Sequence, residues 1–140
     1  TNEIVILHIS DLHFGSNHIC RPEDPTASSA GIPGLKELLL NDFLNIDPIT
    51  KDDTDYSAKK DAPVIAAITG DFTQRASHDE FQEAIAFLNQ LEVSSILGQK
   101  LSKNDIFMVP GNHDVQFDKR TSEERFQPYC SFYNKYFGAE

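Results

Sequence analysis

The sequence contains no tryptophan, one methionine and only two cysteines. Cys20 and Cys130 cannot build the disulfide framework of a small secreted domain, so we expect free thiols in a reducing, cytoplasmic compartment. No apolar stretch is long enough to span a bilayer, so we expect no membrane partner. The first residues lack a basic segment, and Thr1 to Ile9 is therefore interpreted as a strand and not as a signal peptide.

Basic residues are also few, with 12 Lys and Arg against 22 Asp and Glu and a formal net charge of -10. Proteins that hold duplex nucleic acid usually carry basic patches, so this charge disfavours such a partner. The charge does not exclude a phosphorylated small molecule or nucleotide as substrate, because bound cations can supply local positive charge. We find no glycine-rich phosphate loop, which argues against a flavodoxin-like binding domain.

The 140 residues and the apolar fraction of 39% fit one globular domain. Short apolar runs predict strands, and apolar residues at helical spacing predict helices. The strands are expected at Ile4 to Ile9, Val64 to Thr69 and Ile106 to Val109. The helices are expected at about Pro33 to Ile46, from Ser77 to about Leu91, and after Thr121.

Capping boxes mark two of the expected helix starts, because Glu80 follows Ser77 and Glu124 follows Thr121 at the required spacing. Pro128 should break the last helix or start another. The alternation of strands and helices predicts an α/β fold with a mostly parallel sheet. If successive strands add in one direction, right-handed crossovers place all helices on one face of that sheet. The strands are nevertheless apolar on both faces, so something else should cover the second face.

A group of polar residues follows each predicted strand. These groups are Asp11-Leu12-His13, Gly70-Asp71 and Gly111-Asn112-His113-Asp114. In an open parallel sheet, the loops after the carboxyl ends of the strands share one crevice. Carboxylates, imidazoles and an amide oxygen can bind divalent metals there, and His113 can donate a proton near neutral pH. Asp114 is expected to orient the imidazole of His113. The set predicts a metal-dependent phosphoesterase.

The three groups resemble the motifs of the calcineurin-like metallophosphoesterases, which are Asp-x-His, Gly-Asp and Gly-Asn-His-Asp or Glu, each after a strand. The matching segments are His-Ile-Ser-Asp-Leu-His-Phe-Gly at 8–15, Ile-Thr-Gly-Asp at 68–71 and Val-Pro-Gly-Asn-His-Asp at 109–114. The resemblance implies two divalent ions of manganese, iron or zinc, of which we favour manganese. Such a pair would hold a hydroxide for in-line attack on phosphorus.

The resemblance also implies a role for each residue of the motifs. Asp11 and His13 would bind the first metal ion, and Asp71 would bridge both ions. Asn112 would bind the second ion. His113 would protonate the leaving group, with Asp114 as the residue that positions it.

The sequence departs from the family pattern after these motifs. The family continues with a further histidine and a Gly-His-x-His segment that complete both metals, but no histidine follows His113 here. His8, His18 and His78 do not match these positions. The resemblance therefore implies that residues 1–140 form the N-terminal half of a four-layer α/β/β/α sandwich, one sheet with its outer helices. A homodimer or the missing C-terminal half would then cover the open sheet face.

Two functions stay open at this point. The first is two-metal hydrolysis of a phosphomonoester or phosphodiester, weak or absent in this chain alone because ligands are missing. The second is a non-catalytic association module with a partial metal site. Intact Asp71, Asn112, His113 and Asp114 favour the enzyme, because a module freed from catalysis has no need to keep them all.

Overall fold

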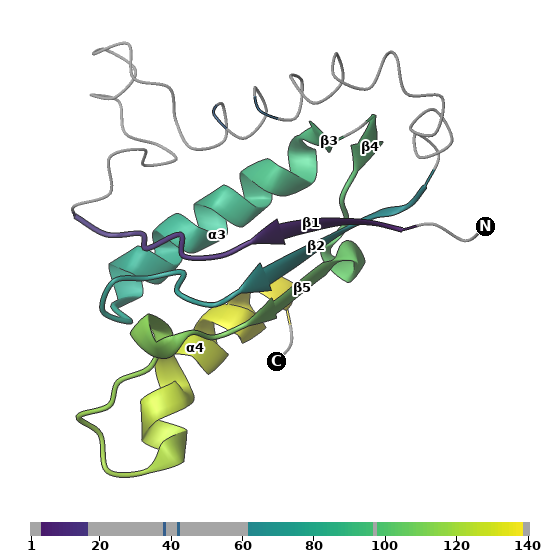
Figure 1. The fold of residues 1–140 in the computed structure, drawn as a ribbon. Helices are drawn as coiled ribbons and strands as arrows, with labels where there is room; N and C mark the ends of the chain where they lie inside the picture. Colours follow the sequence, from purple (N-terminus) through teal and green to yellow (C-terminus); the bar gives the residue numbers. More distant parts are fainter. Residues whose placement is uncertain (1–3, 17–37, 39–41, 43–61, 97, 139–140) are drawn as a thin grey trace.

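The structure is a computed structural model and describes residues 4–16, 38, 42, 62–96 and 98–138 (Figure 1). The helix expected at 33–46 lies outside these residues except for two positions, and His18 and Cys20 lie outside them entirely. The main elements are β1 (Val5–Ile9), β2 (Val64–Thr69), α3 (His78–Val93), β5 (Ile106–Val109) and α4 (Ser122–Phe137). The predicted α/β fold is therefore confirmed, as are the expected strands.

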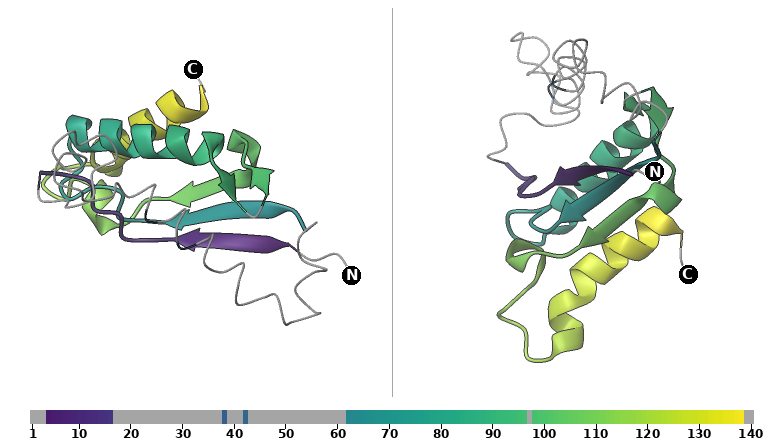
Figure 2. Two further views of the ribbon diagram at one scale, coloured as in Figure 1. Left: turned by 90° about the horizontal axis from the view of Figure 1, so that it is seen from above. Right: turned by 45° about the vertical axis from the view of Figure 1, so that its right-hand side comes forward.

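The central sheet has the strand order β1-β2-β5, and both strand pairs are parallel. Figure 2 shows α3 and α4 on the same side of this sheet. Right-handed crossovers between strands that add in one direction give this arrangement. All three strands therefore end at the same edge of the sheet, where the polar groups of the sequence follow. A small antiparallel pair that the sequence analysis did not anticipate, β3 (Ser95–Ile96) and β4 (Gln99–Lys100), leads from α3 back toward β5.

Helix α3 begins at the predicted capping box. The Ser77 hydroxyl accepts from the amide of Glu80 at 3.4 Å, and the Glu80 carboxylate accepts from the amide of Ser77 at 3.1 Å. The apolar side chains recur at helical spacing and face the sheet, which buries one side of the helix. The buried apolar residues of α3 are Phe81, Ala84, Phe87, Leu88 and Leu91.

Helix α4 also begins at its predicted capping box, but it continues through Pro128, so the expected break is wrong. Proline removes the amide that would bond to the carbonyl of Glu124. Glu124 is exposed, so water can take that bond. Beyond the proline, the ring of Phe132 stacks on Phe81 at 4.9 Å and contacts Phe72 at 5.3 Å, which holds the helix against the core.

The second face of the sheet is exposed and largely apolar, apart from His8 and Thr69, whose side chains lie 2.6 Å apart. Ile6 is 61% exposed, Phe107 57% and Val109 54%. The neighbouring strand positions on the covered face, such as Ile68 and Ile106, are buried beneath the helices. This difference between the faces agrees with the expectation that the helices cover only one of them.

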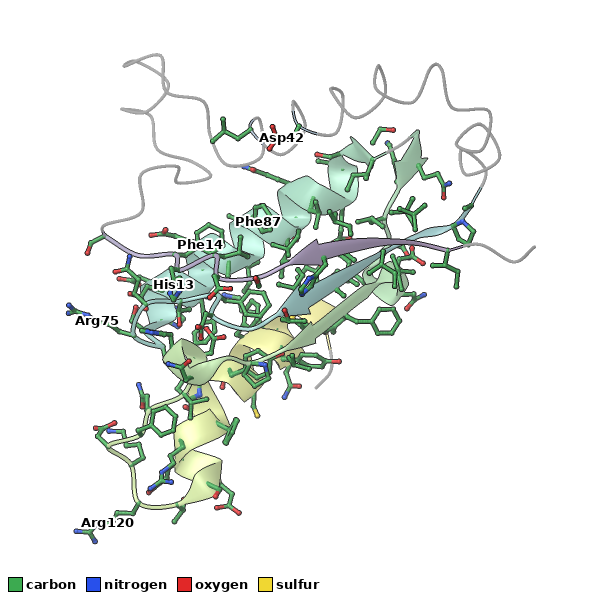
Figure 3. All side chains as sticks on the ribbon, in the orientation of Figure 1. His13, Phe14, Asp42, Arg75, Phe87 and Arg120 are labelled. Atoms are coloured by element: carbon green, nitrogen blue, oxygen red, sulfur yellow. The ribbon has the colours of Figure 1, made fainter. Side chains whose placement is uncertain are left out.

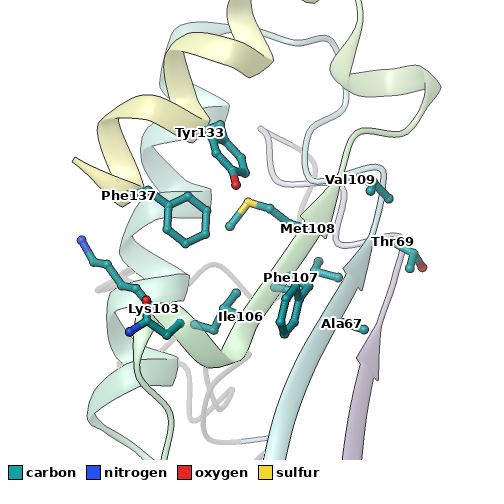
Figure 4. Close-up of a pocket in the computed structure, with 11 residues that line it drawn as sticks. Ala67, Thr69, Lys103, Ile106, Phe107, Met108, Val109, Tyr133 and Phe137 are labelled. Atoms are coloured by element: carbon teal, nitrogen blue, oxygen red, sulfur yellow. The ribbon is translucent and has the colours of Figure 1, made fainter. Parts of the chain in front are cut away.

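A shallow groove of about 490 Å³ runs along the edge strand β5 (Figure 4). Tyr133 and Phe137 of α4 line one side, and Phe107 lies on the other. The groove is apart from the polar residues at the strand ends. Neither of the long helices in the described part of the chain is long and apolar enough to cross a membrane.

Candidate metal centre

The loops that follow β1 and β2 run side by side at the carboxyl end of the sheet. The amide of Asp11 donates to the carbonyl of Gly70 at 3.3 Å, and the amide of His13 donates to the carbonyl of Asp71 at 2.8 Å. Phe14 is fully buried and its ring lies 5.6 Å from that of Phe87 (Figure 3). The first two polar groups of the sequence are therefore brought together by main-chain bonds and anchored by one aromatic side chain.

Two glycines let the loop after β5 approach the loop after β2. A Cβ on Gly70 would lie 2.7 Å from the Cα of Gly111. A Cβ on Gly111 would lie 2.1 Å from a carboxylate oxygen of Asp71. Both positions are closer than non-bonded atoms tolerate, so each motif needs its glycine for close backbone approach.

Three of the predicted metal ligands have a left-handed backbone conformation. The φ angles are 58° at Asp11, 48° at His13 and 54° at Asp71. This conformation costs a residue other than glycine about 1–2 kcal/mol, although aspartate and histidine adopt it more often than most. Strain of this kind gathers at functional sites, where surrounding contacts hold it in place.

The side chains of His13, Asp71 and His113 converge on one point. One donor atom from each lies within 4.8 Å of the others. The Nε2 atom of His13 lies 4.0 Å from Oδ2 of Asp71 and 3.8 Å from Oδ1 of Asp11. Imidazole nitrogens together with carboxylate oxygens suit Mn, Fe or Zn, so the donor set fits a divalent transition metal.

The imidazole of His113 is fixed by a main-chain carbonyl. Its Nδ1 lies 2.9 Å from the carbonyl oxygen of Gln74, which can only accept a hydrogen bond. Nδ1 must therefore carry a proton, and Nε2 is the nitrogen left to bind a ligand or exchange a proton. The ring lies edge-to-face with that of His13, at a centroid distance of 4.8 Å.

Asp114 does not make the contact that the sequence analysis expects. It is fully buried, and Oδ2 accepts from the amides of Gly111 at 2.9 Å and Phe72 at 3.2 Å. Oδ1 accepts from both the amide and the hydroxyl of Thr73, each at 2.9 Å. The carboxylate of Asp114 is therefore bonded to these donors, and the Nδ1 atom of His113 lies against the carbonyl of Gln74. Asp114 instead ties the β2 loop to the β5 loop, and its assignment to catalysis stays a prediction.

The structure places the remaining predicted ligands at the exposed side of the cluster. The side chain of Asp11 is 66% exposed and approaches the cluster through His13. Asn112 is exposed on the short 3-10 helix η3 (Asn112–Asp114), next to His113. The metal-binding roles of both residues stay predictions.

A sequence model of a protein family, described as calcineurin-like phosphoesterase, matches residues 4–140. The chain belongs to the calcineurin-like phosphoesterase family. Comparisons with curated proteins and with solved structures gave no significant match. Membership makes the chain part of a family of hydrolases that typically bind divalent metals and act on phosphorylated substrates, which agrees with the donor set at the strand ends.

Two residues beside this candidate metal centre were not predicted from the sequence. Thr73 bonds to the carboxylate of Asp114. Gln74 bonds to both histidines: its main-chain carbonyl accepts from the ring of His113, and its side-chain Nε2 donates to the carbonyl of His13 at 3.2 Å. A main-chain carbonyl has no sequence signature, so the contact to His113 could not be foreseen. Thr73 and Gln74 follow the Gly-Asp motif with only Phe72 between, and that position was the one available signal.

Proposed function

We propose that this chain carries the metal-binding and proton-donating groups of a phosphoesterase that hydrolyses a phosphomonoester or phosphodiester with two divalent ions, manganese being our first choice. The convergence of His13, Asp71 and His113 from three separate loops supports this proposal most strongly. A small phosphorylated molecule or a nucleotide fits the acidic balance of the chain better than duplex nucleic acid does.

Each group of the cluster has a task in the proposed reaction. His13 and Asp71 would hold metal, together with Asp11 and Asn112. When bound, divalent ions stabilise charge on the phosphoryl oxygens and lower the pKa of water. His113 would donate a proton from Nε2 to the leaving oxygen, while its Nδ1–H stays on the carbonyl of Gln74.

Calorimetric titration with Mn²⁺ tests the proposal, followed by assays with p-nitrophenyl phosphate and bis(p-nitrophenyl) phosphate. We expect binding that Asp71→Asn weakens, and hydrolysis of one substrate that His113→Ala reduces more than it reduces Mn²⁺ affinity. A chain that binds no divalent ion and hydrolyses neither compound would favour the association module instead.

We also propose that the open sheet face is covered, either by a second copy of the chain or by a further segment of a longer protein. The support is the exposure of Ile6, Phe107 and Val109 on one contiguous face, because monomeric proteins rarely expose large apolar patches. The chain would then be one part of a larger phosphoesterase domain.

Sedimentation velocity separates these two forms of cover. If a second copy covers the face, the wild type sediments as a dimer and Phe107→Glu as a monomer. Phe117 is 64% exposed but lies off the sheet, so Phe117→Glu is a matched control that should leave the dimer intact. A monomeric wild type would rule out the second copy and favour the further segment.

A further inference from the structure

Gln74 contacts both histidines of the cluster, although it belongs to none of the three motifs. Its side-chain Nε2 donates to the carbonyl of His13 at 3.2 Å. Its main-chain carbonyl accepts from Nδ1 of His113 at 2.9 Å. One residue therefore fixes the backbone of one histidine and the ring of the other.

The main chain around Gln74 is held rigidly. The amide of Gln74 donates to the carbonyl of Phe14 at 3.2 Å. On one side, the amide of Thr73 donates to Asp114 at 2.9 Å, and on the other, the amide of Arg75 donates to Glu80 at 2.9 Å. Because its neighbours are fixed to two carboxylates, Gln74 can act as a rigid support for the histidines.

The side chain of Gln74 fills space that a glycine leaves open. A Cβ on Gly15 would lie 2.8 Å from Cδ of Gln74. The hydrogen bond from Gln74 is made to a residue with a φ of 48°. This left-handed conformation is higher in energy, so it persists only where surrounding contacts stabilise it. The side-chain amide of Gln74 provides such a contact, because it donates to the main-chain carbonyl of His13.

We infer that Gln74 is a positioning residue whose side chain holds His13 in its left-handed conformation, edge-to-face with His113. Its importance for metal binding rests on the proposed function, but the positioning itself does not. Loss of the side-chain amide of Gln74 would remove the hydrogen bond to the backbone of His13. The bond from the ring of His113 to the main-chain carbonyl of residue 74 would remain.

The test compares the wild type with Gln74→Leu in the metal-free chain by NMR of labelled histidine. The wild type should show a cross-peak between the ring protons of His13 and His113, because the ring centroids are 4.8 Å apart. Gln74→Leu should lose this cross-peak, while the ring nitrogens of His113 keep the Nδ1–H tautomer. Titration with Mn²⁺ should then show an affinity about three- to tenfold lower than that of the wild type, as expected for one lost hydrogen bond.

Gln99 provides a matched control. Its Nε2 donates to the carbonyl of Ala62 at 2.6 Å, which is the same kind of bond at a place away from the cluster. Gln99→Leu should lower stability as Gln74→Leu does, yet keep the cross-peak and the Mn²⁺ affinity. Gln74→Asn, which is one methylene too short to reach His13, serves as a second variant if the leucine variant fails to fold.

Two results would overturn the inference. The first is a Gln74 variant that keeps both the cross-peak and the wild-type Mn²⁺ affinity, and the second is a wild type that lacks the cross-peak. A wild type that shows the cross-peak but binds no Mn²⁺ contradicts the proposed function only. In that case the cross-peak in the variants still decides whether Gln74 positions His13.

Discussion

The loops at the carboxyl end of the sheet have an inner layer and an outer layer that differ in how their polar groups are hydrogen-bonded. The inner layer, here called the frame, consists of the buried residues Phe72, Thr73 and Asp114 and the half-buried Gly111. In the frame, both oxygens of the Asp114 carboxylate accept hydrogen bonds from protein donors. The outer layer, here called the rim, consists of the exposed residues Asp11 and His113 and the half-buried residues His13 and Asp71. Asp11, His13 and Asp71 have a left-handed, strained backbone. The imidazole of His13 lies close to the carboxylates of Asp11 and Asp71.

Neighbouring residues of the Gly-Asn-His-Asp motif therefore belong to different layers and make different contacts. His113 presents its ring to the cluster in the rim, whereas Asp114, the next residue, holds two loops together in the frame. Two aspartates of the motifs therefore differ in their contacts: Asp114 is fully buried and bonded to protein donors through both oxygens, whereas the side chain of Asp71 is 15% exposed and lies beside His13. The same substitution at Asp71 and Asp114 should expose this difference.

The largest effect is expected from Asp114→Asn. The new side-chain NH₂ group would replace one carboxylate oxygen and would face the protein donors that now bond to it, in a fully buried site. The donors at the other oxygen would lose a charged acceptor. We expect a loss of about 3 kcal/mol in the free energy of unfolding, because breaking buried charge-assisted bonds is among the costliest changes. Unfolding in urea measures this loss. A loss below about 1 kcal/mol would contradict the structural role of the carboxylate.

Asp71→Asn should give the opposite result. Asparagine keeps the acceptor for the amide of His113, which bonds to Asp71 at 2.9 Å, and it tolerates a left-handed backbone. We therefore expect a change below about 1 kcal/mol in stability. The loss of a charged donor should lower Mn²⁺ affinity by about 100-fold, measured by calorimetry. If the variant unfolds as easily as Asp114→Asn, the division between frame and rim is wrong.

The sequence predicted the rim better than the frame. Strands, helix starts and the convergence of the three motifs follow from local patterns and from the rule that parallel strands end at one edge. The bonds of Asp114 to Phe72 and Thr73 join residues that are far apart in sequence and use backbone donors, which any residue type provides. The continuation of α4 through Pro128 depends likewise on the packing of Phe132 on α3. Tertiary contacts of this kind leave no pattern in one sequence.

The strained backbone of the rim should affect stability less than the carboxylate of Asp114 does. Asp11 has a φ of 58° and a side chain that is 66% exposed, so its backbone conformation can be relieved with little loss of packing. We expect Asp11→Gly to be about 1 kcal/mol more stable than Asp11→Asn, because glycine adopts this conformation without steric cost. Thermal unfolding measures the difference. Both variants should bind Mn²⁺ more weakly than the wild type, and equal stability of the two would show that the rim stores no strain at this position.

The smallest effect is expected at Tyr129, which packs against the frame. Its ring lies 6.3 Å from that of Phe72, and its buried hydroxyl has no hydrogen-bond partner among the described residues. Tyr129→Phe removes this unsatisfied group, so we expect a gain of about 0.5 kcal/mol in stability. Tyr136 is the matched control because its hydroxyl donates to Glu92 at 2.6 Å, and Tyr136→Phe should lower stability instead.

The pH dependence of stability sharpens the same test. Burial, assisted by the negative charge of Asp114, raises the pKa of Tyr129 above its usual value. The unfolded chain therefore loses this proton near pH 10, while the folded chain keeps it, so stability falls as the pH rises beyond about 10. Between pH 8 and pH 11, the free energy of unfolding in urea should fall less for Tyr129→Phe than for the wild type. The stability difference in favour of the variant should therefore grow with pH. An advantage that stays constant would mean that the Tyr129 hydroxyl ionises as easily in the folded chain as in the unfolded one, which contradicts its burial beside a satisfied, charged Asp114.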